Sequence, residues 1–109
     1  MTSHSFPGLL VKLINLDRSE HRRTQMEKRL LDIGLAYTRL PAVDGKACWA
    51  ELSSTVDVDA FQRNVGRDVM QGEIGCYHSH LQAWRAFVDS DSHTLLVLED
   101  DVVFGLSLI

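Results

Sequence analysis

Hydrophobic and polar positions along the chain alternate between the period of strands and the period of helices. Residues 9–14 form a short apolar run with β-branched members, which is typical of a buried strand. Residues 94–98 form a second such run, and residues 37–40 form a weaker one that Pro41 ends. The pattern therefore predicts three strands.

Helical periodicity fills the segments between these strands. From about residue 19 to residue 33, Met26, Leu30 and Ile33 make one apolar stripe, and Gly34 is suited to end the helix in a left-handed conformation. Residues 48–71 are polar with scattered apolar positions and predict a loop with one or two short helices. After Gly72 a stronger helix is expected. Its apolar positions recur at three- and four-residue steps and are Ile74, Tyr77, Leu81, Trp84 and Val88, with Phe87 widening the face.

The order strand, helix, strand, helix, strand predicts an α/β domain over residues 1–109, with a mostly parallel sheet and helices on both faces. In such sheets ligands bind beyond the carboxyl ends of the strands. Residues 15–19 follow the first strand and residues 99–101 follow the third. We expect both polar turns to open onto the same edge of the sheet.

Composition and charge narrow the functional classes. The chain has 109 residues, 45% of them hydrophobic, a formal net charge of −4 and an estimated pI of 5.6. This is the composition of one globular domain, and it argues against a nucleic-acid partner, which favours strongly basic surfaces. An acidic protein that handles an anionic substrate needs a local basic site or a bridging metal ion. Cys48 and Cys76 form no CxxC pair and are expected to be free thiols.

The first residues lack the basic and apolar segments of a signal peptide, and no apolar run approaches the roughly 20 residues of a membrane span. We therefore expect a cytoplasmic protein. Peripheral association with the inner face of the cytoplasmic membrane and homo-oligomer formation stay open as alternatives.

Three consecutive carboxylates, Glu99, Asp100 and Asp101, follow the third strand. Adjacent like charges repel one another unless a cation offsets them, and Mg²⁺ or Mn²⁺ takes oxygen ligands while keeping positions for phosphates. Residues two apart at a strand end point the same way, so Glu99 and Asp101 are expected to face a ligand together. A solvated acidic turn, or the cap of a following helix, is the alternative.

Residues 21–23 place basic side chains near the start of the first helix, where free backbone N–H groups also suit an anion. Asn15 and Asp17, just before this helix, are candidates for hydrogen bonds to a ribose or a base. The alternative is a solvated basic face paired with Glu20 and Glu27.

The second long helix begins with two glycines in four positions. Because glycine inside a helix costs up to about 1 kcal/mol relative to alanine, Gly75 predicts that another part of the backbone approaches closely there. Glu73 lies in the first turn, where a negative charge also suits the helix dipole.

Cys76 and His80 lie four residues apart and share a helix face, as two metal ligands would. That face is expected to be largely apolar because Trp84 and Phe87 join it. A packed cysteine and a hydrogen-bonded histidine are therefore favoured over a zinc site.

Four segments in this order resemble glycosyltransferase family 25, which includes lipooligosaccharide galactosyltransferases of Gram-negative bacteria and is related to collagen galactosyltransferases. The matching segments are residues 11–19 with Arg22 and Met26, residues 42–45, residues 72–76 with Ser79 and His80, and residues 96–101.

The resemblance implies a GT-A-like (Rossmann-like) fold and a bacterial enzyme of lipopolysaccharide biosynthesis. Such an enzyme transfers a hexose from a nucleotide sugar, typically UDP-galactose, to a lipooligosaccharide or other saccharide acceptor with the help of Mn²⁺ or Mg²⁺. It implies Asp101 as the best metal ligand, with Glu99 beside it, and it makes Glu73 and Asp100 the candidates for a catalytic residue. The residues that it places near the nucleotide sugar are Asn15, Asp17, Arg22, Glu73, His80 and Asp100.

Members of this family continue past the acidic motif into the acceptor site. The chain is therefore expected to be the truncated, nucleotide-sugar-binding N-terminal portion of such an enzyme. A nucleotide-binding module without turnover and an inactive remnant are the alternatives.

Overall fold

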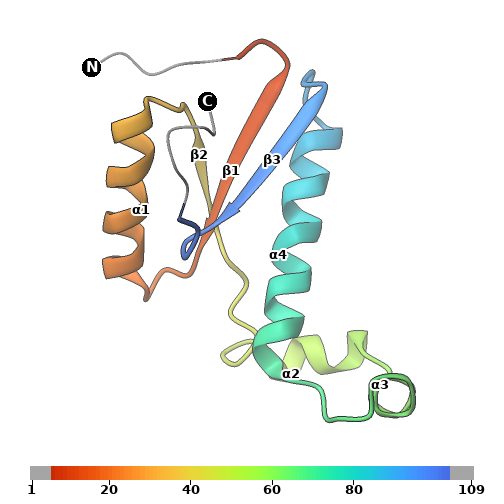
Figure 1. The fold of residues 1–109 in the computed structure, drawn as a ribbon. Helices are drawn as coiled ribbons and strands as arrows, with labels where there is room; N and C mark the ends of the chain where they lie inside the picture. Colours follow the sequence, from red (N-terminus) through yellow and green to blue (C-terminus); the bar gives the residue numbers. More distant parts are fainter. Residues whose placement is uncertain (1–5, 104–109) are drawn as a thin grey trace.

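The structure is a computed structural model that describes residues 6–103, so the expectations about the very start of the chain and its apolar end lie partly outside it. Figure 1 shows one sheet with a helix on either side and two short helices set apart from it. The elements are β1 (Leu9–Asn15), α1 (Glu20–Ile33), β2 (Thr38–Pro41), α2 (Trp49–Leu52), a 3₁₀ turn (Ser53–Thr55), α3 (Val58–Val65), α4 (Gln71–Val88) and β3 (Thr94–Glu99). None of the described helices has the length and apolar character needed to cross a bilayer.

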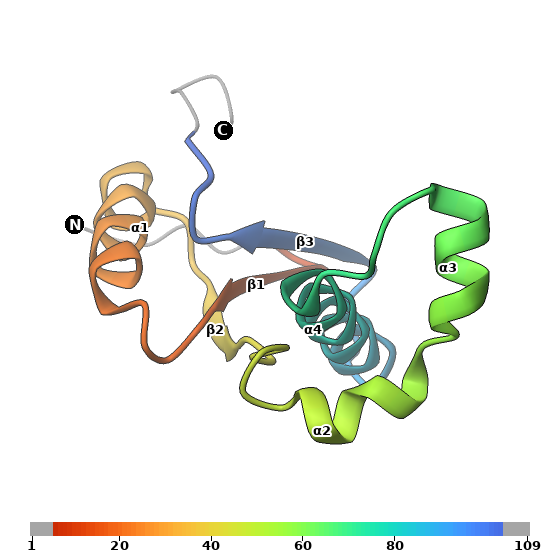
Figure 2. The same ribbon diagram turned by 90° about the horizontal axis from the view of Figure 1, so that it is seen from below.

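The three strands form a parallel sheet in the order β2-β1-β3. Strand β2 lies on one side of the central strand β1, and β3, which follows α4, lies on the other side. The order in which strands are added to the sheet therefore reverses at β1. Figure 2 shows α1 and α4 on opposite sides of this sheet. The α/β class, the parallel sheet and the helices on both faces predicted from the sequence are confirmed.

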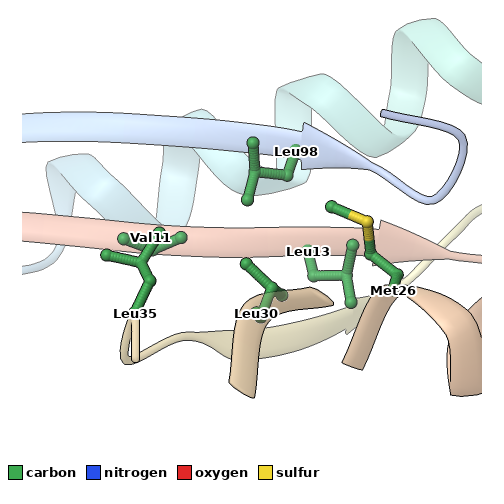
Figure 3. Close-up of a cluster of buried hydrophobic side chains, with 6 residues drawn as sticks. All are labelled: Val11, Leu13, Met26, Leu30, Leu35 and Leu98. Atoms are coloured by element: carbon green, nitrogen blue, oxygen red, sulfur yellow. The ribbon is translucent and has the colours of Figure 1, made fainter. Parts of the chain in front are cut away.

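The core lies between α1 and one face of the sheet (Figure 3). Because side chains alternate along a strand, Val11 and Leu13 of β1 share that face, and Leu13 is fully buried. The apolar stripe predicted for α1 is confirmed, since Met26 and Leu30 are also 0% exposed. The cluster consists of Val11, Leu13, Met26, Leu30, Leu35 and Leu98.

Helix α1 ends as the sequence predicts, and a side chain of β1 holds its start. Gly34 has φ +68°, a left-handed conformation that side chains rarely adopt, and its N–H donates to the carbonyl of Leu31. Ser19 occupies the N-cap position, yet its side chain makes no capping bond. The Asn15 side chain instead donates to the Ser19 carbonyl at 3.2 Å, which ties the start of α1 to the end of β1.

The fully buried positions of α4 are small residues, and the apolar face expected from the sequence is wrong for three of its six members, since only Ile74, Leu81 and Phe87 are partly buried. Tyr77, Trp84 and Val88 are 58%, 53% and 77% exposed. The buried residues of the helix are Gly75, Ser79 and Ala83, which are four apart. Small side chains let the helix backbone come close to its neighbours, and this closeness leaves no room for the larger ones on that face.

The close backbone approach predicted at Gly75 is confirmed, and its partner is the loop after β2. A Cβ atom added to Gly75 would lie 2.5 Å from the nitrogen of Gly45 and 2.5 Å from the oxygen of Val43. Ser79, which is 0% exposed, reinforces this contact because its hydroxyl accepts from the Val43 N–H at 2.8 Å and donates to the Gly75 carbonyl at 2.8 Å. The start of α4 therefore holds the loop after β2 in place.

The Gly45–Gly75 contact predicts opposite effects of alanine at two glycines of α4. Gly75→Ala should lower the free energy of unfolding by about 1–3 kcal/mol, because backbone atoms that cannot rotate away meet the new methyl group. Gly72→Ala meets nothing within 4 Å and should be neutral or raise stability by up to about 1 kcal/mol. Urea unfolding followed by circular dichroism measures both, and equal stability of the two variants would contradict the packing described.

Candidate functional site

A cleft of about 300 Å³ opens at the carboxyl ends of β1 and β3, where the strand order reverses. This is the position at which parallel α/β sheets bind their ligands. Its walls come from the loop after β1, the start of α1, the loop after β2, the start of α4 and the end of β3. The polar side chains that line it are Asn15, Arg18, Arg22, Asp44, Lys46, Cys76, Ser79, Glu99 and Asp100.

Asn15, the last residue of β1, is 1% exposed and connects three walls of the cleft. Its amide nitrogen donates to Asp100 Oδ2 at 2.7 Å and to the Ser19 carbonyl at 3.2 Å. Its amide oxygen accepts from Arg39 Nε at 3.1 Å. Both N–H groups of the amide are thus used within the protein. Asn15 therefore positions Asp100, and the contact of Asn15 with a ribose or base expected from the sequence stays a prediction.

Arg39, a residue that the sequence argument missed, fixes the loop after β1. Its side chain is 16% exposed, and its Nη2 donates to the Asn15 carbonyl at 3.0 Å and to Asp17 Oδ1 at 2.7 Å. The Asp17 side chain is 82% exposed and does not line the cleft. A charged residue inside a predicted strand, next to a polar turn, was the available signal for Arg39.

Basic and acidic side chains balance one another in the lining of the cleft. Arg18 forms an ion pair with Asp44, and Arg22 Nη1 lies 3.6 Å from Asp100 Oδ1. The three basic residues Arg18, Arg22 and Lys46 face the three acidic residues Asp44, Glu99 and Asp100.

The Asp44 carboxylate stabilises a tight turn and also binds an arginine. Asp44 Oδ1 accepts from the backbone N–H groups of Lys46 and Ala47, each at 3.2 Å, and the other carboxylate oxygen pairs with Arg18. This small turn brings Lys46 to the rim of the cleft. The two cations that this turn positions, Arg18 and Lys46, were not expected from the sequence.

Glu99 and Asp100 point to opposite sides of the sheet. Glu99 ends β3 on the side of α4, whereas Asp100 reaches Asn15 and Arg22 on the side of α1. The strand ends at Glu99 and the chain turns at Asp100 and Asp101, so strand alternation does not carry over to Asp101, and the expectation that Glu99 and Asp101 face the ligand together is wrong. Asp101 is exposed and does not line the cleft.

Cys76 and His80 of α4 meet Glu99. The Cys76 thiol lies 3.3 Å from Glu99 Oε1, and His80 Nε2 lies 3.8 Å from the same oxygen. Partial burial and then the neighbouring Glu99 carboxylate raise the pKa of the Cys76 thiol to about 11. A metal was not favoured here because Cys76 and His80 were expected to share an apolar face with Trp84, which is in fact exposed. That assumption is wrong.

The remaining candidates lie outside the cleft lining. Glu73 binds Arg67 through both carboxylate oxygens at 2.6 and 2.9 Å, and this hydrogen bonding lowers the pKa of Glu73. On α1, Arg23 pairs with Glu27 at 3.3 Å, as the solvated alternative predicted, while Arg22 reaches the cleft. The structure thus brings four predicted site residues together, Asn15, Arg22, Glu99 and Asp100, and leaves Asp17, Glu73, His80 and Asp101 off the lining.

Comparison with known proteins gives a consistent result. The family model described as Glycosyltransferase family 25 (LPS biosynthesis protein) matches residues 11–108. A "Glycosyltransferase 25 family member" of Anopheles gambiae is 36% identical over 86% of this chain and 17% of its own length. The human "Procollagen galactosyltransferase 2" is 32% identical over 84% of this chain and 15% of its own length. No solved structure matches the chain.

The chain spans about one sixth of the length of the curated relatives it matches. These relatives come from animals, so the bacterial origin expected from the sequence stays a prediction. The family itself is shown by the match over nearly all of the chain. The chain belongs to glycosyltransferase family 25.

Proposed function

We propose that the cleft binds the diphosphate of a nucleotide sugar, and that this chain supplies the donor-binding part of a hexosyltransferase. The observation that carries the proposal is the convergence of Arg18, Arg22 and Lys46 with Glu99 and Asp100 at the carboxyl ends of two adjacent parallel strands. A cleft of about 300 Å³ is at the small end of ligand sites, which suits a diphosphate and part of its neighbouring rings.

The balance of charge supports a divalent cation in this function. The positive and negative charges of the lining cancel one another. The negative charge of a bound diphosphate would therefore have no counter-charge unless a cation bound with it. The Asp100 carboxylate, which reaches the cleft on the side of α1, fits such an ion, because Mn²⁺ and Mg²⁺ prefer oxygen ligands. When bound, the cation neutralises charge on the departing diphosphate.

The chain's own residues then have distinct tasks. Arg18, Arg22 and Lys46 attract and orient the phosphates, and Arg22 exchanges its contact with Asp100 for one with a phosphate oxygen. Asn15 keeps the Asp100 carboxylate aimed at the cleft. Asp100 is also the better placed of the two catalytic candidates, because Glu73 lies off the lining and its lowered pKa makes it a weaker base.

We propose galactose, delivered as UDP-galactose, as the transferred sugar, because relatives of this chain carry the name procollagen galactosyltransferase. For the acceptor, the family description points to a lipopolysaccharide, as expected from the sequence, whereas those relatives point to procollagen. An assay of transfer should therefore offer both a lipooligosaccharide and a collagen peptide. Cytoplasmic localisation, peripheral membrane association and homo-oligomer formation stay predictions.

Binding of UDP should depend on one of two adjacent arginines. Arg22→Gln removes a charged hydrogen-bond donor from the cleft, and we expect the dissociation constant of UDP in the presence of Mn²⁺ to rise about 10-fold or more. Arg23→Gln is the matched control, because Arg23 pairs with Glu27 outside the cleft, and its affinity should stay within about threefold of the wild type. Isothermal titration calorimetry measures both.

Two results of this titration would count against the proposal. No UDP binding by the wild-type chain, with or without Mn²⁺, would reject the donor site. An equal loss of UDP affinity in Arg22→Gln and Arg23→Gln would reject the placement of the donor site in this cleft.

Turnover separates an enzyme from a nucleotide-binding module. Slow, metal-dependent release of galactose from UDP-galactose would favour an enzyme.

The acidic segment gives a second test, because strand spacing and cleft geometry favour different metal ligands. Asp100→Asn should remove most of the Mn²⁺-dependent gain in UDP affinity, since Asp100 lines the cleft. If strand spacing sets the ligands, Asp101→Asn should lose as much of this gain in UDP affinity. Because Asp101 is exposed and lies outside the lining, we expect a smaller loss. UDP titrations at several Mn²⁺ concentrations measure the difference. A greater loss in Asp101→Asn would make Asp101 the principal ligand and overturn the assignment to Asp100.

A further inference from the structure

A sulfur atom, an imidazole nitrogen and a carboxylate oxygen gather where α4 passes the end of β3. Cys76 and His80 lie one helical turn apart, and Glu99 approaches both from the strand. Their ligand atoms all lie within 4.8 Å of one another. We propose that Cys76, His80 and Glu99 form a binding site for a borderline-soft divalent cation, and that Zn²⁺ fits it best.

The separations are close to those that tetrahedral zinc requires. With bonds of about 2.0 to 2.3 Å, two ligand atoms of a tetrahedral zinc ion lie about 3.3 to 3.8 Å apart. Cys76 Sγ lies 3.3 Å and His80 Nε2 lies 3.8 Å from Glu99 Oε1. Both separations lie within the tetrahedral range, and the Cys76 sulfur and an imidazole nitrogen of His80 lie within 4.8 Å of each other, so side-chain rotation can bring all three atoms around one ion.

The charges around the cluster also suit a cation. Within residues 6–103, no lysine or arginine forms an ion pair with Glu99, whose charge faces a thiol and an imidazole. A divalent ion would supply the missing positive charge. When the bond between the metal and Cys76 Sγ forms, the thiol proton leaves to solvent, and the thiolate and the carboxylate together neutralise the ion.

The ligand types separate this site from the cation proposed to accompany the diphosphate. Thiolate and imidazole ligands select zinc or cobalt, whereas Mn²⁺ and Mg²⁺ prefer sets made of oxygen atoms. Three protein ligands leave a fourth position, which in zinc sites holds water or a substrate atom. Cys76 and Glu99 also line the cleft, whereas His80 does not, so the proposed site lies at the edge of the cleft. The site stands on its own geometry and does not depend on the donor proposal.

Cobalt spectroscopy on the whole chain tests the site directly. Titration of the metal-free protein with Co²⁺ should give a thiolate-to-cobalt charge-transfer band and the strong visible bands of tetrahedral cobalt, and one equivalent of Zn²⁺ should remove both. Cys76→Ser should abolish the charge-transfer band. His80→Ala and Glu99→Gln should each weaken cobalt binding at least tenfold.

Matched variants separate this site from other causes. Cys48→Ser, which alters the other free cysteine, should keep the full spectrum, and so should Asp100→Asn, whose defect is expected in UDP binding. Circular dichroism confirms that each variant is folded. The proposal is overturned if the wild type shows no charge-transfer band, or if the band survives in Cys76→Ser.

Discussion

One buried amide holds the functional edge of this molecule together. Asn15 lies at the end of the central strand, and its hydrogen bonds reach the start of α1, the acidic segment after β3 and an arginine of β2. A buried polar group must find partners or lose stability, so the full use of this amide restricts how the three segments can sit. The Asp100 carboxylate is one of these partners. The hydrogen bonds that hold the three segments together therefore also orient this negatively charged group in the cleft.

The opposite wall of the cleft depends on two glycines, whose lack of side chains lets two backbone segments touch. Gly45 and Gly75 bring the loop after β2 against the start of α4, and the Ser79 hydroxyl bonds across that contact. Close approach of this kind requires small residues on α4, which is why Trp84 and Tyr77 turn outwards. The same rotation of the helix directs Cys76 and His80 towards Glu99. The mixed cluster of sulfur, nitrogen and oxygen atoms thus follows from how α4 packs.

The elements of the fold could be predicted because each has a local signal. Apolar runs mark β1 and β3, the stripe of Met26 and Leu30 marks α1, and Gly34 marks its end. The convergence of the two polar turns also followed from the rule for parallel sheets, and the bond between Asn15 and Asp100 confirms it. The orientation of α4 could not be predicted in this way, because periodicity identifies a face but not the tightness of its packing. Arg39 and Lys46 were missed because their roles come from long-range contacts and from a turn, not from any pattern along the chain.

The contact between Gly45 and Gly75 has a consequence for how this fold can vary. The contact joins the two ends of the segment 46–74, which contains α2 and α3. Figure 1 shows these helices away from the sheet. Because this contact holds the two ends of the segment together, the segment is a closed loop, and the free energy of unfolding depends only weakly on the length of such a loop. Insertions or deletions in it are therefore expected to change the outer surface while the binding edge stays as it is. The region around α3 is where relatives of this chain can diverge at least cost.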